Sequence, residues 1–212
     1  MAQGFLTRSL CKIGGVDLMG CSINSVGVFC GSASGVGDVF ASQAGSLGAH
    51  LGHQQLSLVY GGGRVGLMGA VADGCLSHGG QVTGVMPRTL VDKEIAHPHL
   101  TQLIIVSDMH ERKAKMATMA DAFIVLPGGT GTMEEFFEQW TWGQIGYHRK
   151  PIALLNVAGF FDPLLTMIDQ MVAQGFLSAQ YRDMLLCASD IKTILSKLSE
   201  YEHPPEKGYA QI

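Results

Sequence analysis

The sequence predicts a single α/β domain of the doubly wound, Rossmann-like kind, with a mostly parallel sheet of about seven strands flanked by helices. From residue 25 onward, short β-rich apolar segments alternate with longer amphipathic segments, as in repeated βαβ units. The run Phe123–Leu126 within one strand candidate is apolar at every position, as a parallel strand covered by helices on both faces requires. The 28 glycines gather in short runs at the ends of apolar segments, which is typical of turns that approach a ligand.

Seven segments have the length and composition of strands, and six longer segments between them have helical spacing. The expected strands are Ser25–Cys30, Leu56–Tyr60, Gln81–Met86, Leu103–Val106, Ala122–Leu126, Pro151–Leu155 and Met184–Cys187. The expected helices are Gly37–Gly52, Leu67–His78, Met109–Ala120, Met133–Ile145, Phe161–Ala173 and Asp190–Leu198. Residues 1–22 are expected to be an N-terminal extension, residues 23–200 the domain, and residues 201–212 a C-terminal tail. Right-handed crossovers then place every strand-to-helix turn at the ligand-binding edge of the sheet.

Composition and charge exclude several classes of partner. The chain has 212 residues, of which 47% are hydrophobic and 15% charged, and this length suits one core better than two. The formal net charge is −4 and no basic stripe with interleaved aromatic residues occurs, so nucleic acid is not an expected partner. No apolar run reaches the roughly 18 residues that span a bilayer, and residues 1–20 lack a secretory-signal pattern. We therefore expect a cytoplasmic protein that does not bind membranes. Its expected ligand is a small anion.

The cysteines and histidines do not predict a metal site. The cysteines are odd in number and contain no Cys-x-x-Cys pair, which argues against both a disulfide framework and zinc. They are Cys11, Cys21, Cys30, Cys75 and Cys187. We expect all of them to be reduced, with Cys30 and Cys187 in the core. The spacing of His97 and His99 in an expected loop gives only weak support for a metal.

The most informative motif is Leu126–Glu135, Leu-Pro-Gly-Gly-Thr-Gly-Thr-Met-Glu-Glu, which follows a buried strand and opens a helix. Glycines let the backbone approach an oxyanion, and the N–H groups and dipole of a helix N-terminus favour negative charge. These features indicate a phosphate-binding loop. The alternative is a tight turn in which Thr132 and Glu135 form a Thr-x-x-Glu capping box, although a cap alone does not need three glycines in four residues.

Two further strand-to-helix turns are expected at the same edge, Cys30–Ser34 and Tyr60–Gly69. The second contains Gly61-x-Gly63-x-x-Gly66, the spacing of a dinucleotide fingerprint, but a lone match is weak. The acidic residue usual at the end of the next strand is absent, because Met86-Pro87-Arg88 stands there. We interpret the turn as another wall of a mononucleotide pocket.

The segment Ser107–Lys113 places Arg112 and Lys113 in the first turn of a helix. The macrodipole opposes cations there by about 0.3–1 kcal/mol, so another interaction should hold them. Their spacing from Met109 directs them toward the sheet edge. The alternative is a solvated basic face continued by Lys115. Two acidic side chains can cap this helix: Asp108 and Glu111.

Four motifs together resemble the LONELY GUY (LOG) family, in order, within residues 23–200. They are Pro127–Glu135, Met109–Lys113, Tyr60–Gly63 and Gly66–Gly69. Members of this family are phosphoribohydrolases that act on cytokinin riboside 5′-monophosphates, many act on AMP, and many carry an older lysine decarboxylase label. The resemblance implies cleavage of a nucleoside 5′-monophosphate to free base and ribose 5-phosphate, with no organic cofactor and no metal requirement.

The resemblance also implies roles by position, with Arg112 and Glu135 as the catalytic pair. Glu94 is expected near the base. Thr130 replaces a tyrosine common in plant members and Glu111 replaces a frequent glutamine, and both departures bear on the identity of the base. The other expected nucleotide contacts are Ser32, Gly61, Gly62, Gly63, Met109, Lys113, Gly128, Gly129, Thr130, Gly131, Thr132, Met133, Glu134 and Thr141.

Cleavage of a ribose–base bond builds positive charge on the sugar, so the site needs a carboxylate near the anomeric carbon and a positioned water. Glu135 is the candidate carboxylate, and Arg112 is expected to fix the nucleotide. One alternative is a decarboxylase, but it would need a Schiff-base lysine for pyridoxal phosphate, and no lysine has a recognisable setting of that sort. Another is a nucleotide carrier of the same fold without turnover, because function resides in the site and not in the fold.

Aromatic residues near the helix Met133–Ile145 suggest an interface. Trp140, Trp142 and Tyr147 exceed what one core face needs, although simple burial would also account for them. With the family resemblance in mind, we expect a homodimer in which Phe136–Ile145 takes part in the interface and borders the pocket.

Overall fold

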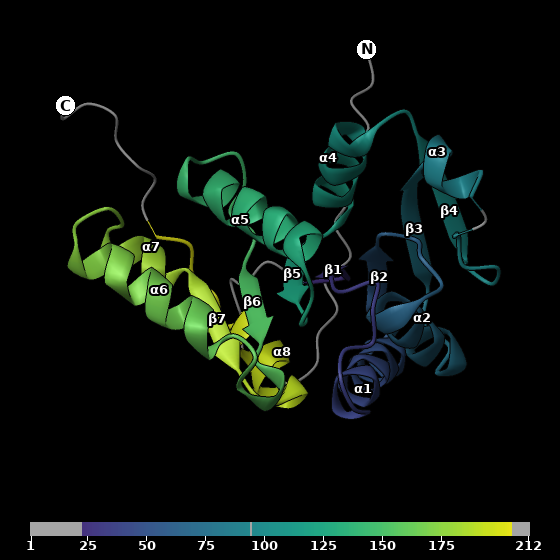
Figure 1. Ribbon diagram of the computed structural model, residues 1–212, viewed down its shortest axis with the longest axis horizontal. Helices are drawn as coiled ribbons and strands as arrows, with labels where there is room; N and C mark the ends of the chain where they lie inside the picture. Colours follow the sequence, from purple (N-terminus) through teal and green to yellow (C-terminus); the bar gives the residue numbers. More distant parts are fainter. Residues whose placement is uncertain (1–22, 94, 205–212) are drawn as a thin grey trace, which may run out of the picture.

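The computed structural model describes residues 23–93 and 95–204. The expected extension at 1–22 and the end of the expected tail, 205–212, lie outside the described residues. Within the described part, seven strands form one sheet in the order β4-β3-β2-β1-β5-β6-β7 (Figure 1), and every pairing is parallel. The strands are β1 (Ser25–Phe29), β2 (Ser57–Tyr60), β3 (Val82–Pro87), β4 (Gln102–Val106), β5 (Ala122–Val125), β6 (Ile152–Leu155) and β7 (Leu185–Ala188).

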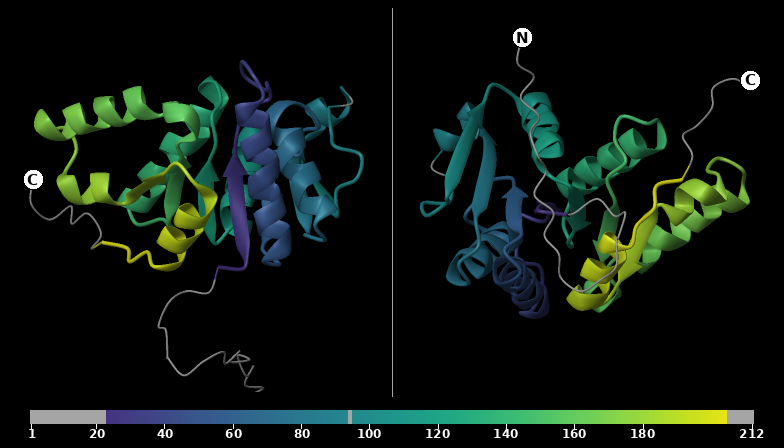
Figure 2. Two further views of the ribbon diagram at one scale, coloured as in Figure 1. Left: turned by 90° about the horizontal axis from the view of Figure 1, so that it is seen from below. Right: turned by 180° about the vertical axis from the view of Figure 1, so that it is seen from behind.

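Helices connect the strands and form a layer on each face of the sheet (Figure 1). The long helices are α1 (Val39–His53), α2 (Gly66–Ser77), α4 (Met109–Met119), α5 (Thr130–Gln144), α6 (Asp162–Ala173) and α8 (Ile191–Ser199). The short ones are α3 (Arg88–Val91), the 3-10 turn η1 (Val157–Gly159) and α7 (Ala179–Asp183). Both views of Figure 2 place β3 and β4 at one end of the molecule and α6 with β7 at the other.

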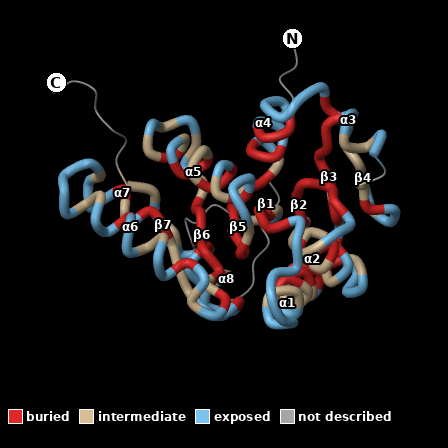
Figure 3. The backbone as a smooth tube through the Cα atoms, in the orientation of Figure 1, coloured by how far each residue is buried: buried red, intermediate tan, exposed pale blue. Residues whose placement is uncertain are grey.

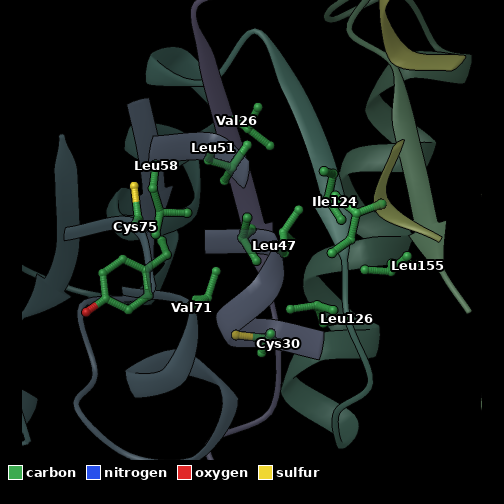
Figure 4. Close-up of a cluster of buried hydrophobic side chains, with 14 of the residues drawn as sticks. Val26, Cys30, Leu47, Leu51, Leu58, Val71, Cys75, Ile124, Leu126 and Leu155 are labelled. Atoms are coloured by element: carbon green, nitrogen blue, oxygen red, sulfur yellow. The ribbon is translucent and has the colours of Figure 1, made fainter. Parts of the chain in front are cut away.

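Two hydrophobic cores lie on the two faces of the sheet, because successive strand side chains point to opposite faces. Val28 of β1 packs among α1, α2 and α8, whereas its neighbour Phe29 packs among α4, α5 and α6. Figure 4 shows the first core, in which Leu47 of α1 and Val71 of α2 lie over the sheet. The central strands are therefore buried, whereas most exposed residues lie on the outer faces of the helices and in the loops (Figure 3). The edge strand β4 also has exposed residues, Gln102 and Ile105.

The predicted fold class is confirmed, and the differences are local. Helix α5 begins at Thr130, three residues earlier than expected, because the Thr-Gly-Thr segment is already helical. The expected set also omitted α3, η1 and α7, which are too short to show a helical period.

The cysteines of the described part are free thiols, as expected, but only one of the two assigned to the core is fully buried. Cys30 is buried, whereas Cys187 is half-buried because β7 is an edge strand that the helices cover incompletely. Cys11 and Cys21 lie outside the described residues. Across residues 23–93 and 95–204, no helix has the length and apolar character needed to cross a membrane.

Candidate active site

Three glycine-rich turns meet where the strand order reverses, between β1 and β5. The Gly31 N–H donates to the Pro127 carbonyl (3.0 Å), and the Leu67 N–H donates to the Gly31 carbonyl (3.1 Å). Ligands in open α/β sheets bind at such a reversal, beside the carboxyl ends of the strands. The turns after β1, β2 and β5 therefore lie side by side at a binding edge.

The turn after β5 leads directly into α5, whose N-cap is Gly129 with no side-chain hydrogen bond. The first N–H groups of a helix have no intrahelical partner and favour an anion. A Cβ at Gly129 or at Gly131 would meet no heavy atom within 4 Å, so the fold does not require glycine at either position. A Cβ at Gly128, by contrast, would overlap Thr132. Gly129 and Gly131 thus leave room over the helix N-terminus for a ligand phosphate.

The capping-box alternative is wrong. Thr132 is the third residue of α5 and not its N-cap. Glu135 does not cap the helix, since its Oε1 atom accepts a hydrogen bond from Arg112 Nη1 at 2.7 Å. The N-terminus of α5 therefore keeps its capacity to bind an anion.

Arg112 is held in place by the start of α4 and by β3. Asp108 caps α4 by accepting two N–H groups of the first turn, both at 2.9 Å, and Glu111 Oε2 accepts the Ser107 N–H at 2.7 Å. This confirms the predicted cap. Arg112 Nε donates to the Val85 carbonyl (3.1 Å), and the residue is only 9% exposed. Its guanidinium is therefore directed inward at the sheet edge.

Arg112 and Glu135 form a buried ion pair at the floor of the site. Burial raises the pKa of Glu135, and the adjacent guanidinium of Arg112 opposes that rise. The Cys30 thiol lies next to the pair, and burial together with the Glu135 charge raises the pKa of that thiol. Cys30 is therefore a protonated, apolar part of the wall, and Glu135 is the carboxylate of the site.

Lys113 is buried as well, but it points away from the pair. Its Nζ donates to Glu134 and, at 2.9 Å, to Glu138, both on α5. Burial alone would lower the pKa of Lys113, but these two carboxylates raise it overall. The solvated-face alternative is therefore wrong for Lys113 and Arg112, whereas Lys115 is exposed as that alternative expected.

A cavity of about 310 Å³ opens above the Arg112–Glu135 pair. It brings together most of the side chains that the sequence singled out. Its walls are Cys30, Gly31, Ser32, Met68, Met109, Arg112, Gly129, Thr130, Gly131, Thr132, Glu134 and Glu135.

Some predicted contacts do not line this cavity. Gly61 instead packs against Arg112, because a Cβ at Gly61 would overlap the guanidinium. Gly128 lines an adjoining cavity of about 330 Å³. Thr141 is exposed about three turns along α5, roughly 16 Å from Thr130. Four further predicted contacts are also absent from the wall: Gly62, Gly63, Lys113 and Met133. Glu94 lies outside the described residues.

Sequence reasoning missed Cys30 and Met68 as parts of the cavity wall. Cys30 directly follows β1, so its place at the carboxyl end of a strand was a usable signal. Met68 lies in the first turn of α2, inside the motif Gly66–Gly69. Neither side chain carries charge. Cys30 was expected in the core, and Met68 was noted only as part of that motif.

Both ring nitrogens of His97, in the pair His97 and His99, have hydrogen-bond partners within the protein. His97 Nε2 lies 3.0 Å from Asp73 Oδ1, and the His99 N–H donates to His97 Nδ1 at 3.2 Å. Among the residues that the structure describes, no three His, Cys, Asp or Glu side chains gather closely enough to hold a metal ion.

Solved structures share the fold. The molybdenum cofactor carrier protein of Chlamydomonas reinhardtii matches with a TM-score of 0.64 and 18% identity, covering 83% of this chain and 95% of that chain. The molybdenum cofactor binding protein of Rippkaea orientalis matches with the same score, identity and coverage. At this identity the likeness shows the α/β fold alone.

Sequence relatives are much closer. The chain is 49% identical over 176 residues to cytokinin riboside 5′-monophosphate phosphoribohydrolase LOG7 of Arabidopsis thaliana, covering 82% of this chain and 81% of that protein. It is 45% identical over 181 residues to the phosphoribohydrolase LOG of Oryza sativa subsp. japonica, covering 85% and 75%. A family model described as "Possible lysine decarboxylase" matches residues 68–198. The chain therefore belongs to the LONELY GUY family, which contains these plant phosphoribohydrolases and which that model describes.

Proposed function

We propose that this chain hydrolyses the N-glycosidic bond of nucleoside 5′-monophosphates such as AMP or isopentenyladenosine monophosphate, releasing the free base and ribose 5-phosphate. The relatives named above are phosphoribohydrolases of this type. The observation that carries the proposal is the buried Arg112–Glu135 pair beside the open N-terminus of α5. Such a site offers an anion cradle and a carboxylate within one cavity.

The chemistry follows from where charge develops. As the C–N bond breaks, its electron pair leaves with the base and the sugar becomes oxocarbenium-like, which a nearby carboxylate stabilises. Glu135 supplies that negative charge and orients the water that attacks the anomeric carbon. The water adds to this carbon as hydroxyl, and its proton is taken up by the departing base, so the products are the neutral free base and ribose 5-phosphate. Arg112 fixes the nucleotide and the direction of the Glu135 carboxylate, and the turn Gly128–Thr132 binds the 5′-phosphate.

Two other functions are less well supported. A decarboxylase with a Schiff-base lysine needs an amine of lowered pKa, whereas Glu134 and Glu138 raise the pKa of Lys113, the lysine beside the site. A nucleotide carrier has no evident use for a buried catalytic pair below the phosphate loop. Tight AMP binding without base release would favour the carrier.

We also propose that the chain forms a homodimer through the groove between α4 and α5. Phe136 and Trp140 are buried and serve the core of the protomer, since Trp140 Nε1 donates to the Tyr181 carbonyl. Tyr147 is 76% exposed, and it borders a cavity of about 390 Å³. An exposed aromatic beside an apolar cavity is typical of an interface. The cavity is lined by Ala114, Ala117, Thr118, Trp142, Tyr147, His148 and Lys150.

Product analysis with AMP and with isopentenyladenosine monophosphate tests the function. We expect Glu135→Gln, which keeps the size of the side chain and removes its charge, to lower kcat by about 10²–10³-fold. Chromatography of the base and ribose 5-phosphate measures this change. Glu200→Gln makes the same substitution at an exposed position at the end of α8 and serves as the control. An unchanged kcat in Glu135→Gln would remove Glu135 from the mechanism.

A further inference from the structure

Residues 95–97 cross the glycine turn that follows β2. The Arg64 N–H donates to the Ile95 carbonyl (3.1 Å), and the His97 N–H donates to the Gly62 carbonyl (2.8 Å). Between them, Gly63 and Ala96 form an isolated antiparallel bridge. The turn Gly61–Gly63 is thus paired with a segment from beyond β3 and α3, which we call the crossing segment.

The His97 side chain anchors the crossing segment to α2. Its imidazole is fully partnered, because Nε2 lies 3.0 Å from Asp73 Oδ1 and Nδ1 accepts the His99 N–H at 3.2 Å. Because Nδ1 accepts a hydrogen bond, these partners assign the ring proton to Nε2, which donates to Asp73. His97 is only 6% exposed, and the proposed mechanism gives it no role.

The anchored turn forms one wall of the Arg112 site. The close approach of Gly61 leaves no room for a Cβ beside the Arg112 guanidinium. The buried Tyr60 hydroxyl also stabilises this turn, because it donates a hydrogen bond to the Gly63 carbonyl at 3.1 Å. The other two sides of the guanidinium are fixed by Val85 and Glu135. Of these three restraints, the turn is the one that the crossing segment holds in place.

We propose that His97 is a positioning residue for the reaction. Held by Asp73, it keeps Gly61–Gly63 against Arg112 and so sets the direction of the guanidinium toward Glu135 and the nucleotide. This inference rests on the proposed function. It assigns His97 an effect on turnover that passes through Arg112, although His97 does not line the cavity.

A double-mutant cycle between His97→Ala and Arg112→Lys tests this role. Arg112→Lys keeps the positive charge but removes the planar fork that the turn directs. We expect His97→Ala to lower kcat for AMP about 10- to 100-fold in the wild-type background, because small displacements of a catalytic group are costly. In the Arg112→Lys background we expect a loss of less than about twofold. Equal losses in both backgrounds, or no loss in either, would overturn the proposal.

Conservative variants add a second readout. Asp73→Asn keeps an acceptor for Nε2–H, so we expect kcat near that of the wild type, whereas Asp73→Ala should reproduce the loss seen in His97→Ala. Asp73→Ala also replaces His97→Ala in the cycle if the latter fails to fold, since Asp73 is an exposed residue. A loss in Asp73→Asn as large as that in Asp73→Ala would contradict the assigned tautomer and hence the proposal.

Failure of the proposed function gives a different result. If the wild type binds AMP but releases no base, the same cycle is measured on the Kd of ribose 5-phosphate by calorimetry. Loss of affinity in His97→Ala that vanishes in the Arg112→Lys background would support positioning without turnover. An additive loss would overturn it.

Discussion

Gly129 and Gly131 differ from Gly128 in what the fold requires of them. A Cβ added at Gly129 or Gly131 would meet no heavy atom within 4 Å, whereas one added at Gly128 would overlap the Thr132 side chain. Packing against Thr132 therefore explains the third glycine, whereas the first two are accounted for by the proposed phosphate binding.

This distinction predicts opposite effects of one substitution on stability and on binding. Gly131→Ala should raise the free energy of unfolding by up to about 1 kcal/mol, since alanine favours the helix. It should also raise KM for AMP severalfold, because the new methyl group occupies the proposed phosphate space. Urea unfolding and steady-state kinetics measure the two effects.

Gly45→Ala in α1 is the matched control. A Cβ there meets its nearest neighbour at an ordinary 3.7 Å, so a gain in stability without a change in KM is expected. An unchanged KM in Gly131→Ala would contradict the phosphate cradle.

For single residues, the sequence predicted where a side chain points better than it predicted which residue that side chain contacts. The inward direction of Arg112 and the cap by Asp108 followed from local helix geometry, and both are confirmed. The partner of Lys113 did not follow, because Glu134 is 21 positions away and on another helix. Only the packing of α4 beside α5 brings the two together.

At the scale of elements, the long segments were predictable and the ends were not. The apolar run of β5 and the periodic stripe of α5 fix the type of each element. The start of α5 was misplaced because glycine has low helix propensity and Gly131 reads locally as loop. The proposed phosphate site depends on that one turn, so the boundary that was misplaced most lies in the proposed site.

The connection between α5 and β6 predicts how stability depends on pH. His148 lies there with its ring 5.7 Å from that of Phe123, and it accepts the Lys150 N–H. Burial, together with the charges of Lys150 and His203, lowers the pKa of His148 from 6.5 to about 4. Between these two pH values the unfolded chain binds more protons than the folded one, so stability falls as the pH drops from 6.5 toward 4.

We expect protonation linked to His148 to lower the free energy of unfolding by about 1–2 kcal/mol over that pH range. This figure allows for the solvent that reaches the half-buried ring. Urea unfolding at pH 7 and pH 5 measures the difference. His148→Gln should show a smaller difference, whereas the same substitution at the exposed His110 should behave like the wild type. An equal pH dependence in wild type and His148→Gln would refute the assignment.

At the scale of the whole molecule, alternation of elements was enough to predict one doubly wound sheet and its ligand-binding edge. It could not fix the strand order, because that order depends on which strands pair across long stretches of chain. The reversal between β1 and β5, where the cavity opens, is visible only in the assembled sheet.

The proposed dimer is tested at the exposed end of the α4–α5 groove. Tyr147→Glu places a charge in the expected interface and should convert the dimer to a monomer in light scattering. Phe176→Glu, a substitution of an aromatic that is 88% exposed at the far end of α6, is the control and should leave the mass unchanged. A wild-type monomer at micromolar concentration would contradict the dimer.

The pairing of β1 with β5, which we call the seam, has a consequence for how the protein folds during synthesis. Asp121, just before β5, accepts hydrogen bonds from the backbone and hydroxyl of Ser25, which lies 96 positions earlier in the chain. Closing so long a loop is entropically slow, and β1 leaves the ribosome with one edge that has no strand to pair with until β5 follows. The proposed phosphate cradle lies on that same seam, so a newly made chain would gain the proposed binding site only when its two halves have joined.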